Sequence, residues 1–169
     1  MKILRLNKFN LSIAFFLLIV IATSLFPHKK LIWNSTGSLP KGLYYLTSKR
    51  HIDCGDIVYF PVPDNVKRLV FIERRWLPEF ANLLKEVMAV EGDYICENQT
   101  ALQVREMIGP VSPVDSYGRP LPRFVYCGPL KKDQLFVGDL LNWRSFDSRY
   151  FGPVNVKDVK GVAIPIWTF

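Results

Sequence analysis

The feature that most constrains the fold is an uncharged stretch near the start of the chain. From Phe9 to Phe26, eighteen residues carry no charge. As a helix rising about 1.5 Å per residue they reach about 27 Å, close to the hydrocarbon thickness of a bilayer. We therefore expect one N-terminal transmembrane helix. A cleaved secretory signal is the alternative, since Ala22-Thr23-Ser24 forms a small-residue cleavage site, but the apolar run exceeds the roughly 7 to 15 residues typical of such signals.

The charge distribution separates this segment from the rest of the chain. Five of the 22 Lys and Arg lie in the first thirty residues, which contain no acid, and 17 bases face 15 acids from Leu31 onward. A basic start before a nearly neutral body argues against nucleic-acid binding and favours contact with a lipid bilayer. We expect residues 1–30 to form a cytoplasmic start and membrane anchor, and residues 31–169 to form one exported domain.

The exported part is expected to be mainly β. Aromatic and β-branched runs broken by Gly, Pro and Asp predict short strands packed in a single closed core. One helical turn or two is expected within Leu77–Leu84, a hairpin turn at Asn98-Gln99, and an exposed loop over Gly109–Pro122. The expected strands are Gly42–Thr47, Asp56–Phe60, Leu84–Val90, Tyr94–Cys96, Leu102–Arg105, Phe124–Tyr126, Gln134–Val137 and Val159–Trp167.

Cysteine and histidine usage bounds the chemistry further. Cys96 and Cys127 each end a strand-like stretch, and a disulfide between them is consistent with export; three buried thiols are the equally weighted alternative. Cys54 would be the odd one. With only His28 and His51 present, a histidine-rich metal site is disfavoured, and we expect neither a metal nor an organic cofactor.

Ser38 is the candidate nucleophile. It lies in the small-residue stretch Asn34-Ser-Thr-Gly-Ser38-Leu-Pro-Lys-Gly-Leu-Tyr44, where Gly37 frees the backbone for a sharp turn. The Thr36 hydroxyl and the Ser38 amide could both stabilise an oxyanion. A hydroxyl needs a base, and the scarcity of histidine points to lysine. The plain alternative is an ordinary turn.

Lys85 is the candidate base, because in an extended strand it shares a face with the apolar Leu83, Val87 and Ala89. Burial would lower its pKa to roughly 7 or 8, whereas a solvated edge-strand lysine is the alternative. Further on, Ser145, Asp147 and Arg149 lie on one side if that segment is extended, so they could orient a neutral amine. A solvated turn is the alternative there.

Taken in order, these stretches resemble the type I signal peptidase family, which uses a Ser-Lys dyad. The similar boxes are Ser38-Leu39-Pro40, Gly55–Phe60, Leu84–Val87 with Val90–Asp93, and Gly138-Asp139 through Ser145–Arg149. The runs Asn34–Tyr44 and Ser145–Pro153 are most similar to the conjugative-transfer branch of TraF-type peptidases. Glu86 and Glu91 depart from the usual Arg and Pro.

The resemblance implies a signal-peptidase-like β fold and a role for each candidate. Ser38 would be the nucleophile and Lys85 the general base, with the Ser38 amide and the Thr36 hydroxyl as the oxyanion hole. Ser145 would hold the Lys85 amine, and Asp147 with Arg149 would support the site. The implied substrates are exported precursors with signal peptides, including propilin, cleaved on the periplasmic side of the bacterial inner membrane.

Three functions remain open from the sequence. The first is a TraF-like peptidase that matures propilin, and the second is a housekeeping signal peptidase with many substrates. The third is a non-enzymatic anchored β-domain of a secretion apparatus, for which Ser38→Ala and Lys85→Ala would change nothing. Self-cleaving repressors share a Ser-Lys fold but bind DNA in the cytosol, which the neutral body and apolar helix argue against.

Overall fold

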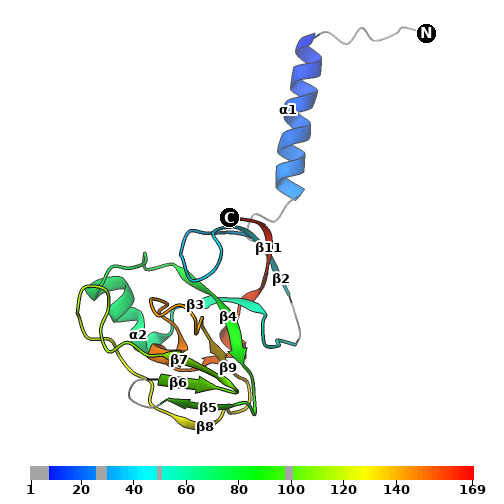
Figure 1. The fold of residues 1–169 in the computed structure, drawn as a ribbon. Helices are drawn as coiled ribbons and strands as arrows, with labels where there is room; N and C mark the ends of the chain where they lie inside the picture. The colour runs from blue at the N-terminus through cyan, green and yellow to red at the C-terminus, as the bar shows by residue number, and fades with distance from the viewer. Residues whose placement is uncertain (1–7, 26–29, 49–50, 98–100) are drawn as a thin grey trace. The chain divides into compact units, whose positions relative to one another are not determined.

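The computed structural model describes the chain except residues 1–7, 26–29, 49–50 and 98–100. It divides into two units, residues 1–31 and residues 32–169. In the first unit, helix α1 (Lys8–Leu25) occupies the stretch in which a membrane-spanning helix is expected (Figure 1). No helix among the described residues is long and apolar enough to cross a membrane.

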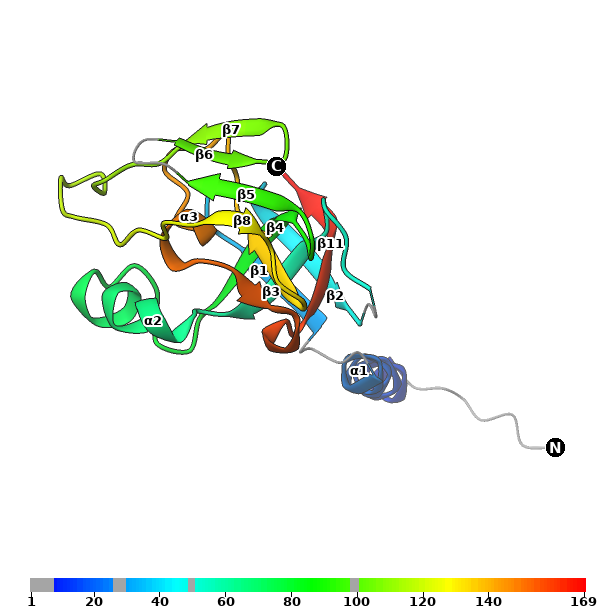
Figure 2. The same ribbon diagram turned by 90° about the horizontal axis from the view of Figure 1, so that it is seen from below.

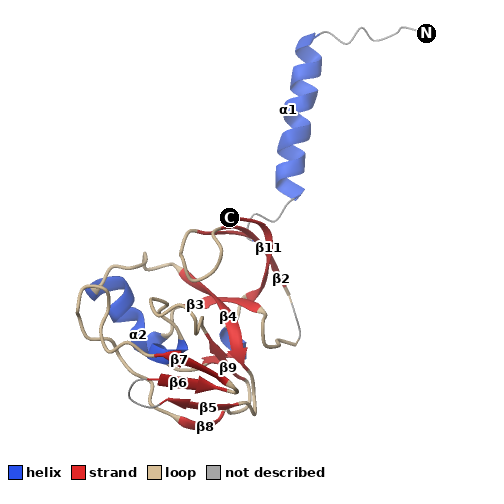
Figure 3. Ribbon diagram, viewed as in Figure 1, coloured by secondary structure: helices blue, strands red, loops and turns tan. Residues whose placement is uncertain are grey.

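The second unit is mainly β, as expected, and its strands dominate the ribbon in Figure 3. A seven-stranded sheet has the order β1-β2-β11-β3-β4-β9-β10, with antiparallel pairing between β11 and both β2 and β3, and between β4 and both β3 and β9. Its strands are β1 (Leu31–Asn34), β2 (Gly42–Thr47), β3 (Ile57–Pro61), β4 (Asn82–Ala89), β9 (Gln134–Val137), β10 (Val154–Asn155) and β11 (Gly161–Thr168).

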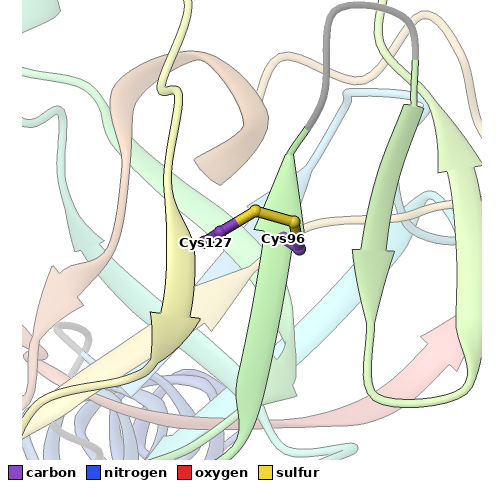
Figure 4. Close-up of a disulfide and its surroundings, with 2 residues drawn as sticks. All are labelled: Cys96 and Cys127. Carbon is purple, nitrogen blue, oxygen red and sulfur yellow. A yellow bond between two sulfur atoms is a disulfide. The ribbon is translucent and has the colours of Figure 1, made fainter.

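A smaller four-stranded sheet has the order β7-β6-β5-β8, and its strands lie side by side in Figures 1 and 2. The strands are β5 (Tyr94–Glu97), β6 (Ala101–Val104), β7 (Met107–Pro110) and β8 (Cys127–Pro129). Cys96 and Cys127 are directly opposite each other on β5 and β8 and are joined by a disulfide (Figure 4). The bridge is therefore present, whereas Cys54 is a free, exposed thiol.

Two sheets replace the single closed core expected from the sequence, and each has its own buried cluster. One cluster packs β3, β4, β9 and the helical segment around Phe60, Val70 and Val137. The other packs the small sheet around Ile95 and Leu102. Phe146 packs against both clusters, so the loop that carries Ser145 and Asp147 lies where the two cores meet.

Most of the expected strands form within a residue or two of the predicted bounds, because alternating burial is visible in the sequence. The strand expected over Phe124–Tyr126 is wrong, since β8 begins only at Cys127. The short strand β7 occupies part of the expected loop Gly109–Pro122 and was not anticipated. The turn expected at Asn98-Gln99 lies outside the described residues, but β5 and β6 on either side pair antiparallel.

The helix expected within Leu77–Leu84 is also wrong, because β4 already begins at Asn82. The helical segment lies earlier, as α2 (Asp64–Lys67) continued by a π-helical turn, η2 (Arg68–Glu73). It starts after Pro63, a residue compatible with a helix start, and buries Val66 and Val70 in the larger core. The remaining helical turns are α3 (Ser148–Phe151) and η3 (Val156–Asp158).

Candidate active site

A cavity of about 940 Å³ opens in the β unit, and both candidates of the dyad line it. Ser38 reaches it from the loop between β1 and β2, which we call the serine loop (residues 34–40). Lys85 reaches it from β4, and Ser145 from the loop between β9 and α3, which we call the support loop (residues 138–147). The fold thus brings together three residues that are far apart in the chain.

Lys85 is buried, with 5% of its surface exposed. It lies on β4 opposite Val58 of β3, two residues before the part of β4 that pairs with β9. Its Nζ donates a hydrogen bond of 2.8 Å to Ser145 Oγ. Burial lowers the pKa of Lys85 to about 8, while the negative charges of Asp147 and Asp139 raise it and Arg149 lowers it. A large share of the amine is therefore neutral near pH 8, as a general base requires.

Asp147 and Arg149 form a fully buried ion pair beneath the support loop. Arg149 Nε donates to Asp147 Oδ1 at 2.8 Å and Arg149 Nη2 donates to Asp147 Oδ2 at 2.7 Å. The hydrogen bonds to Asp147 and the charge of that carboxylate raise the pKa of Arg149 against the opposing effect of burial. The segment does not continue as an extended strand, the condition under which its three polar side chains would share one side. Asp147 instead caps the N-terminus of α3 by accepting from the Arg149 amide.

The same guanidinium fixes the backbone of the support loop. Arg149 Nη2 lies 3.0, 2.9 and 3.2 Å from the carbonyl oxygens of Asp139, Asn142 and Ser145, which share its two protons with Asp147. Position 138 requires glycine, since a Cβ there would lie 2.7 Å from Asp147 Cγ. One buried cation therefore holds the turn that presents Ser145 to Lys85.

Asn34 holds the serine loop and is a residue that the sequence reasoning missed. Its Oδ1 accepts from the Thr36 amide at 3.1 Å and from Thr36 Oγ1 at 2.7 Å. Its Nδ2 lies 3.1 to 3.2 Å from the carbonyl oxygens of Thr36, Leu39 and Pro40. Thr36 has one hydroxyl proton, so in this arrangement the proton expected to serve an oxyanion is already donated to Asn34.

Asn142 connects the two loops and was also missed. Its Nδ2 donates to the carbonyl oxygen of Gly37 at 3.3 Å, across 105 positions of sequence. Its Oδ1 accepts from the Arg144 amide at 3.0 Å, which closes a local turn. The only hint in the sequence is its place within the box Gly138–Arg149, since no local pattern indicates a contact with Gly37.

The remaining titratable candidates lie elsewhere. His51 is exposed, pairs with Asp53, and is not among the residues that line the cavity, while His28 lies outside the described residues. Within the described part of the chain, no three His, Cys, Asp or Glu residues are grouped so that they could hold a metal ion. The cavity therefore brings together the hydroxyl of Ser38 and the buried amine of Lys85, and its lining also includes the carboxylate of Asp115, which is paired with Arg119.

A protein-family comparison identifies the fold's relatives. The model of the family described as signal peptidase, peptidase S26, matches residues 3–168. The chain belongs to this family. The signal peptidase match covers the serine loop, β4 and the support loop together, so all the candidate residues fall within it.

Curated relatives of this family member are named for plasmid transfer. It is 31% identical over 146 residues to a plasmid transfer protein TraF of Escherichia coli, covering 80% of this chain and 82% of the relative. It is also 31% identical over 149 residues to the conjugal transfer protein TraF of Agrobacterium fabrum, covering 80% and 81%. A crystal structure of signal peptidase I from Enterococcus faecalis matches 68% of this chain and 98% of that one, with 21% identity and a TM-score of 0.39.

Proposed function

We propose that this member of the signal peptidase family is a serine endopeptidase in which Ser38 is the nucleophile and Lys85 is the general base. The observation that carries the proposal is the environment of Lys85. A buried amine with a pKa of about 8, hydrogen-bonded to Ser145 and lining the same cavity as Ser38, is suited to remove a hydroxyl proton near neutral pH.

The reaction is an acyl transfer in two steps. Neutral Lys85 takes the proton of Ser38 Oγ as the oxygen bonds to the scissile carbonyl carbon, and the resulting ammonium protonates the departing amine as the C–N bond breaks. Water then attacks the ester, giving a proton to Lys85, which returns it to Ser38 Oγ as the acyl–oxygen bond breaks. The products are a free amine and a carboxylate.

The oxyanion of each tetrahedral intermediate would be stabilised by the Ser38 amide. The Thr36 hydroxyl can join it only by giving up its hydrogen bond to Asn34, because it has a single proton. Ser145 would orient the amine of Lys85, and the buried pair of Asp147 and Arg149 would hold Ser145 in place.

The substrates we propose are exported precursors with signal or leader peptides, and pilin precursors of conjugative transfer in particular. The names of the TraF relatives, which refer to plasmid and conjugal transfer, support a pilin precursor as substrate. The Cys96–Cys127 bridge supports an oxidising compartment outside the cytoplasm. We propose that the uncharged stretch Phe9–Phe26 anchors the chain at the bacterial inner membrane, next to substrates held in the same bilayer.

The test is precursor processing by the full-length protein in detergent. Wild type is compared with Ser38→Ala and Lys85→Ala on a pilin precursor and on a generic preprotein, with melting curves as a folding control. The proposal expects cleavage by wild type and a loss of at least about 10²-fold in each folded variant. Cleavage of the generic preprotein alone would favour the housekeeping role, and cleavage that survives both substitutions would refute the dyad.

A further inference from the structure

The peptide bond between Gly37 and Ser38 is held at one end by the support loop. Asn142 Nδ2 donates to the Gly37 carbonyl oxygen at 3.3 Å. The other end of that peptide is the Ser38 N–H. Among the hydrogen bonds of the described residues, none uses this N–H, so it is available for a ligand in the cavity.

Peptide geometry ties these two ends together. In a planar trans peptide, the carbonyl oxygen and the following N–H point in opposite directions. A hydrogen bond that fixes the direction of the Gly37 carbonyl therefore also fixes the direction of the Ser38 N–H. Asn142 accordingly controls the orientation of a donor that it does not touch.

Glycine at position 37 makes such a restraint necessary. A Cβ placed on Gly37 would meet no atom within 4 Å, and its φ does not lie in the left-handed region. Neither crowding nor backbone conformation therefore requires glycine here, but glycine leaves the backbone free to rotate. Without an external partner for the carbonyl, the Gly37–Ser38 peptide has little to hold it in one orientation.

Asn142 is itself firmly held. Its carbonyl oxygen accepts from Arg149 Nη2 at 2.9 Å and from the Ser145 amide at 3.0 Å. Its own amide donates to Asp139 Oδ1 at 3.2 Å. The residue thus belongs to the same buried network that places Ser145 against Lys85, and its side chain extends that network to the serine loop.

We propose that Asn142 is a positioning residue that aims the Ser38 amide at the oxyanion of the reaction. This inference rests on the proposed peptidase function. The support loop binds the amine of Lys85 through Ser145, and through Asn142 it would also orient the Ser38 N–H. One network would then align the general base and the oxyanion donor. The effect is on the transition state, because the N–H bonds most strongly to the oxygen once it carries negative charge.

Asn142→Ser is the principal test. Serine is uncharged and can still accept from the Arg144 amide in a local turn, but its hydroxyl is too short to replace the amide donor to Gly37. We expect kcat for precursor cleavage to fall about 10- to 100-fold, somewhat less than the loss of a whole oxyanion donor. KM should stay within about twofold, and the midpoint of the pH–rate profile should not move, since Lys85 and Ser145 are untouched.

Two further variants keep the outcome decisive. Asn142→Asp keeps the shape and the acceptor for Arg144 but removes the donor, so it should lower kcat as well and serves if the serine variant unfolds. Its added negative charge raises the pH midpoint by itself, so kcat of this variant is compared on the alkaline plateau and its midpoint is not used. Asn65→Asp is the matched control, because it also removes an asparagine donor to a carbonyl, that of Phe151 at 3.0 Å, away from the cavity. It should leave kcat unchanged.

The results separate the inference from the function on which it rests. If wild type cleaves no precursor, the peptidase proposal fails, and the role of Asn142 fails with it. If wild type cleaves and Asn142→Ser has an unchanged kcat, only the positioning role is refuted. A lower kcat with a raised KM or a displaced pH midpoint would also refute it, since this pattern indicates a collapsed support loop.

Discussion

Lys85 Nζ lies 2.8 Å from Ser145 Oγ, although sixty positions separate the two residues in the chain. Both are at least 95% buried. The contact joins a strand of the larger sheet to the loop where the two cores meet. It gives a buried amine a hydroxyl as its hydrogen-bond partner, and this arrangement has measurable consequences for catalysis and for stability.

Ser145→Ala should lower kcat about tenfold, because the amine of Lys85 loses the group that orients it. The wild-type rate should rise with pH to a midpoint near 8, since only neutral Lys85 can accept the proton. A hydroxyl that accepts from the ammonium favours the charged form, so the variant's midpoint should move to lower pH. Precursor cleavage measured from pH 6 to 10 tests both points, with Ser48→Ala, at an exposed serine away from the cavity, as control. Identical profiles of wild type and Ser145→Ala would contradict the role of Ser145.

Lys85→Met should abolish cleavage and yet stabilise the fold. The pKa of Lys85 is about 8 in the folded protein against 10.5 for an ordinary solvated lysine, so the unfolded chain binds more protons between these values and wild-type stability rises with pH across that window. Below pH 8 the full cost of burying the charge is present. Methionine removes this cost, and the free energy of unfolding at pH 7 should increase by about 1–3 kcal/mol.

Urea unfolding at pH 7 and pH 10 measures this gain, which should shrink at the higher pH. Lys131→Met, at an exposed lysine, is the control and should change stability by less than about 0.5 kcal/mol at either pH. An increase in the free energy of unfolding that does not depend on pH would show that the charge of Lys85 does not destabilise the folded protein.

Asp147→Ala should destabilise the domain by about 3–5 kcal/mol, because it leaves the guanidinium of Arg149 buried without its counter-ion. The support loop should loosen with it, and kcat should fall further than stability alone explains. Denaturant melts and initial rates below the melting temperature provide the measurements. Asp64→Ala removes an exposed ion pair with Lys67 and should change little; equal effects of the two substitutions would contradict the prediction.

Thr36→Val should lower kcat by less than about tenfold. Removing an oxyanion donor that is free in the resting enzyme lowers kcat about 10²–10³-fold. Thr36 Oγ1 must first break its hydrogen bond of 2.7 Å to Asn34 Oδ1, so its net contribution to kcat is smaller. Asn34→Ala should have the larger effect, because it frees both ends of the serine loop. Single-turnover cleavage rates compare the two; a loss above 10²-fold in Thr36→Val would show that its hydroxyl is a principal donor.

The double variant Cys96→Ala, Cys127→Ala should be about 3–4 kcal/mol less stable, since the bridge closes a 31-residue separation in the unfolded chain. Its kcat well below the melting temperature should match wild type, because neither cysteine lines the cavity. Thermal melts with and without reductant, beside Cys54→Ala, test this. Unchanged melting in the double variant would mean that the bridge does not constrain the unfolded chain.

Local pattern in the chain was enough to place most of the β structure. The bounds of Gly42–Thr47 and Gln134–Val137 follow from β-branched and aromatic runs between turn residues, which indicate strands wherever they occur. The same reasoning misplaced the helix, because Asp64–Glu73 is held by burying Val66 and Val70 in a core assembled from distant strands. The candidate residues Ser38, Lys85, Ser145, Asp147 and Arg149 could be selected from residue chemistry and the order of their boxes.

The contacts among those residues could not be read from the chain. Whether the amine of Lys85 is shielded from water depends on the packing of β4 against β9 and the support loop. The alternation of residues along the strand allows an exposed lysine as readily as a buried one. The pairing of Cys96 with Cys127 depends on the register of β5 and β8, and the bond from Asn142 to Gly37 on how closely two loops approach. Hydrogen bonds and desolvation act over a few ångströms, so they arise only once folding has brought distant segments to that separation.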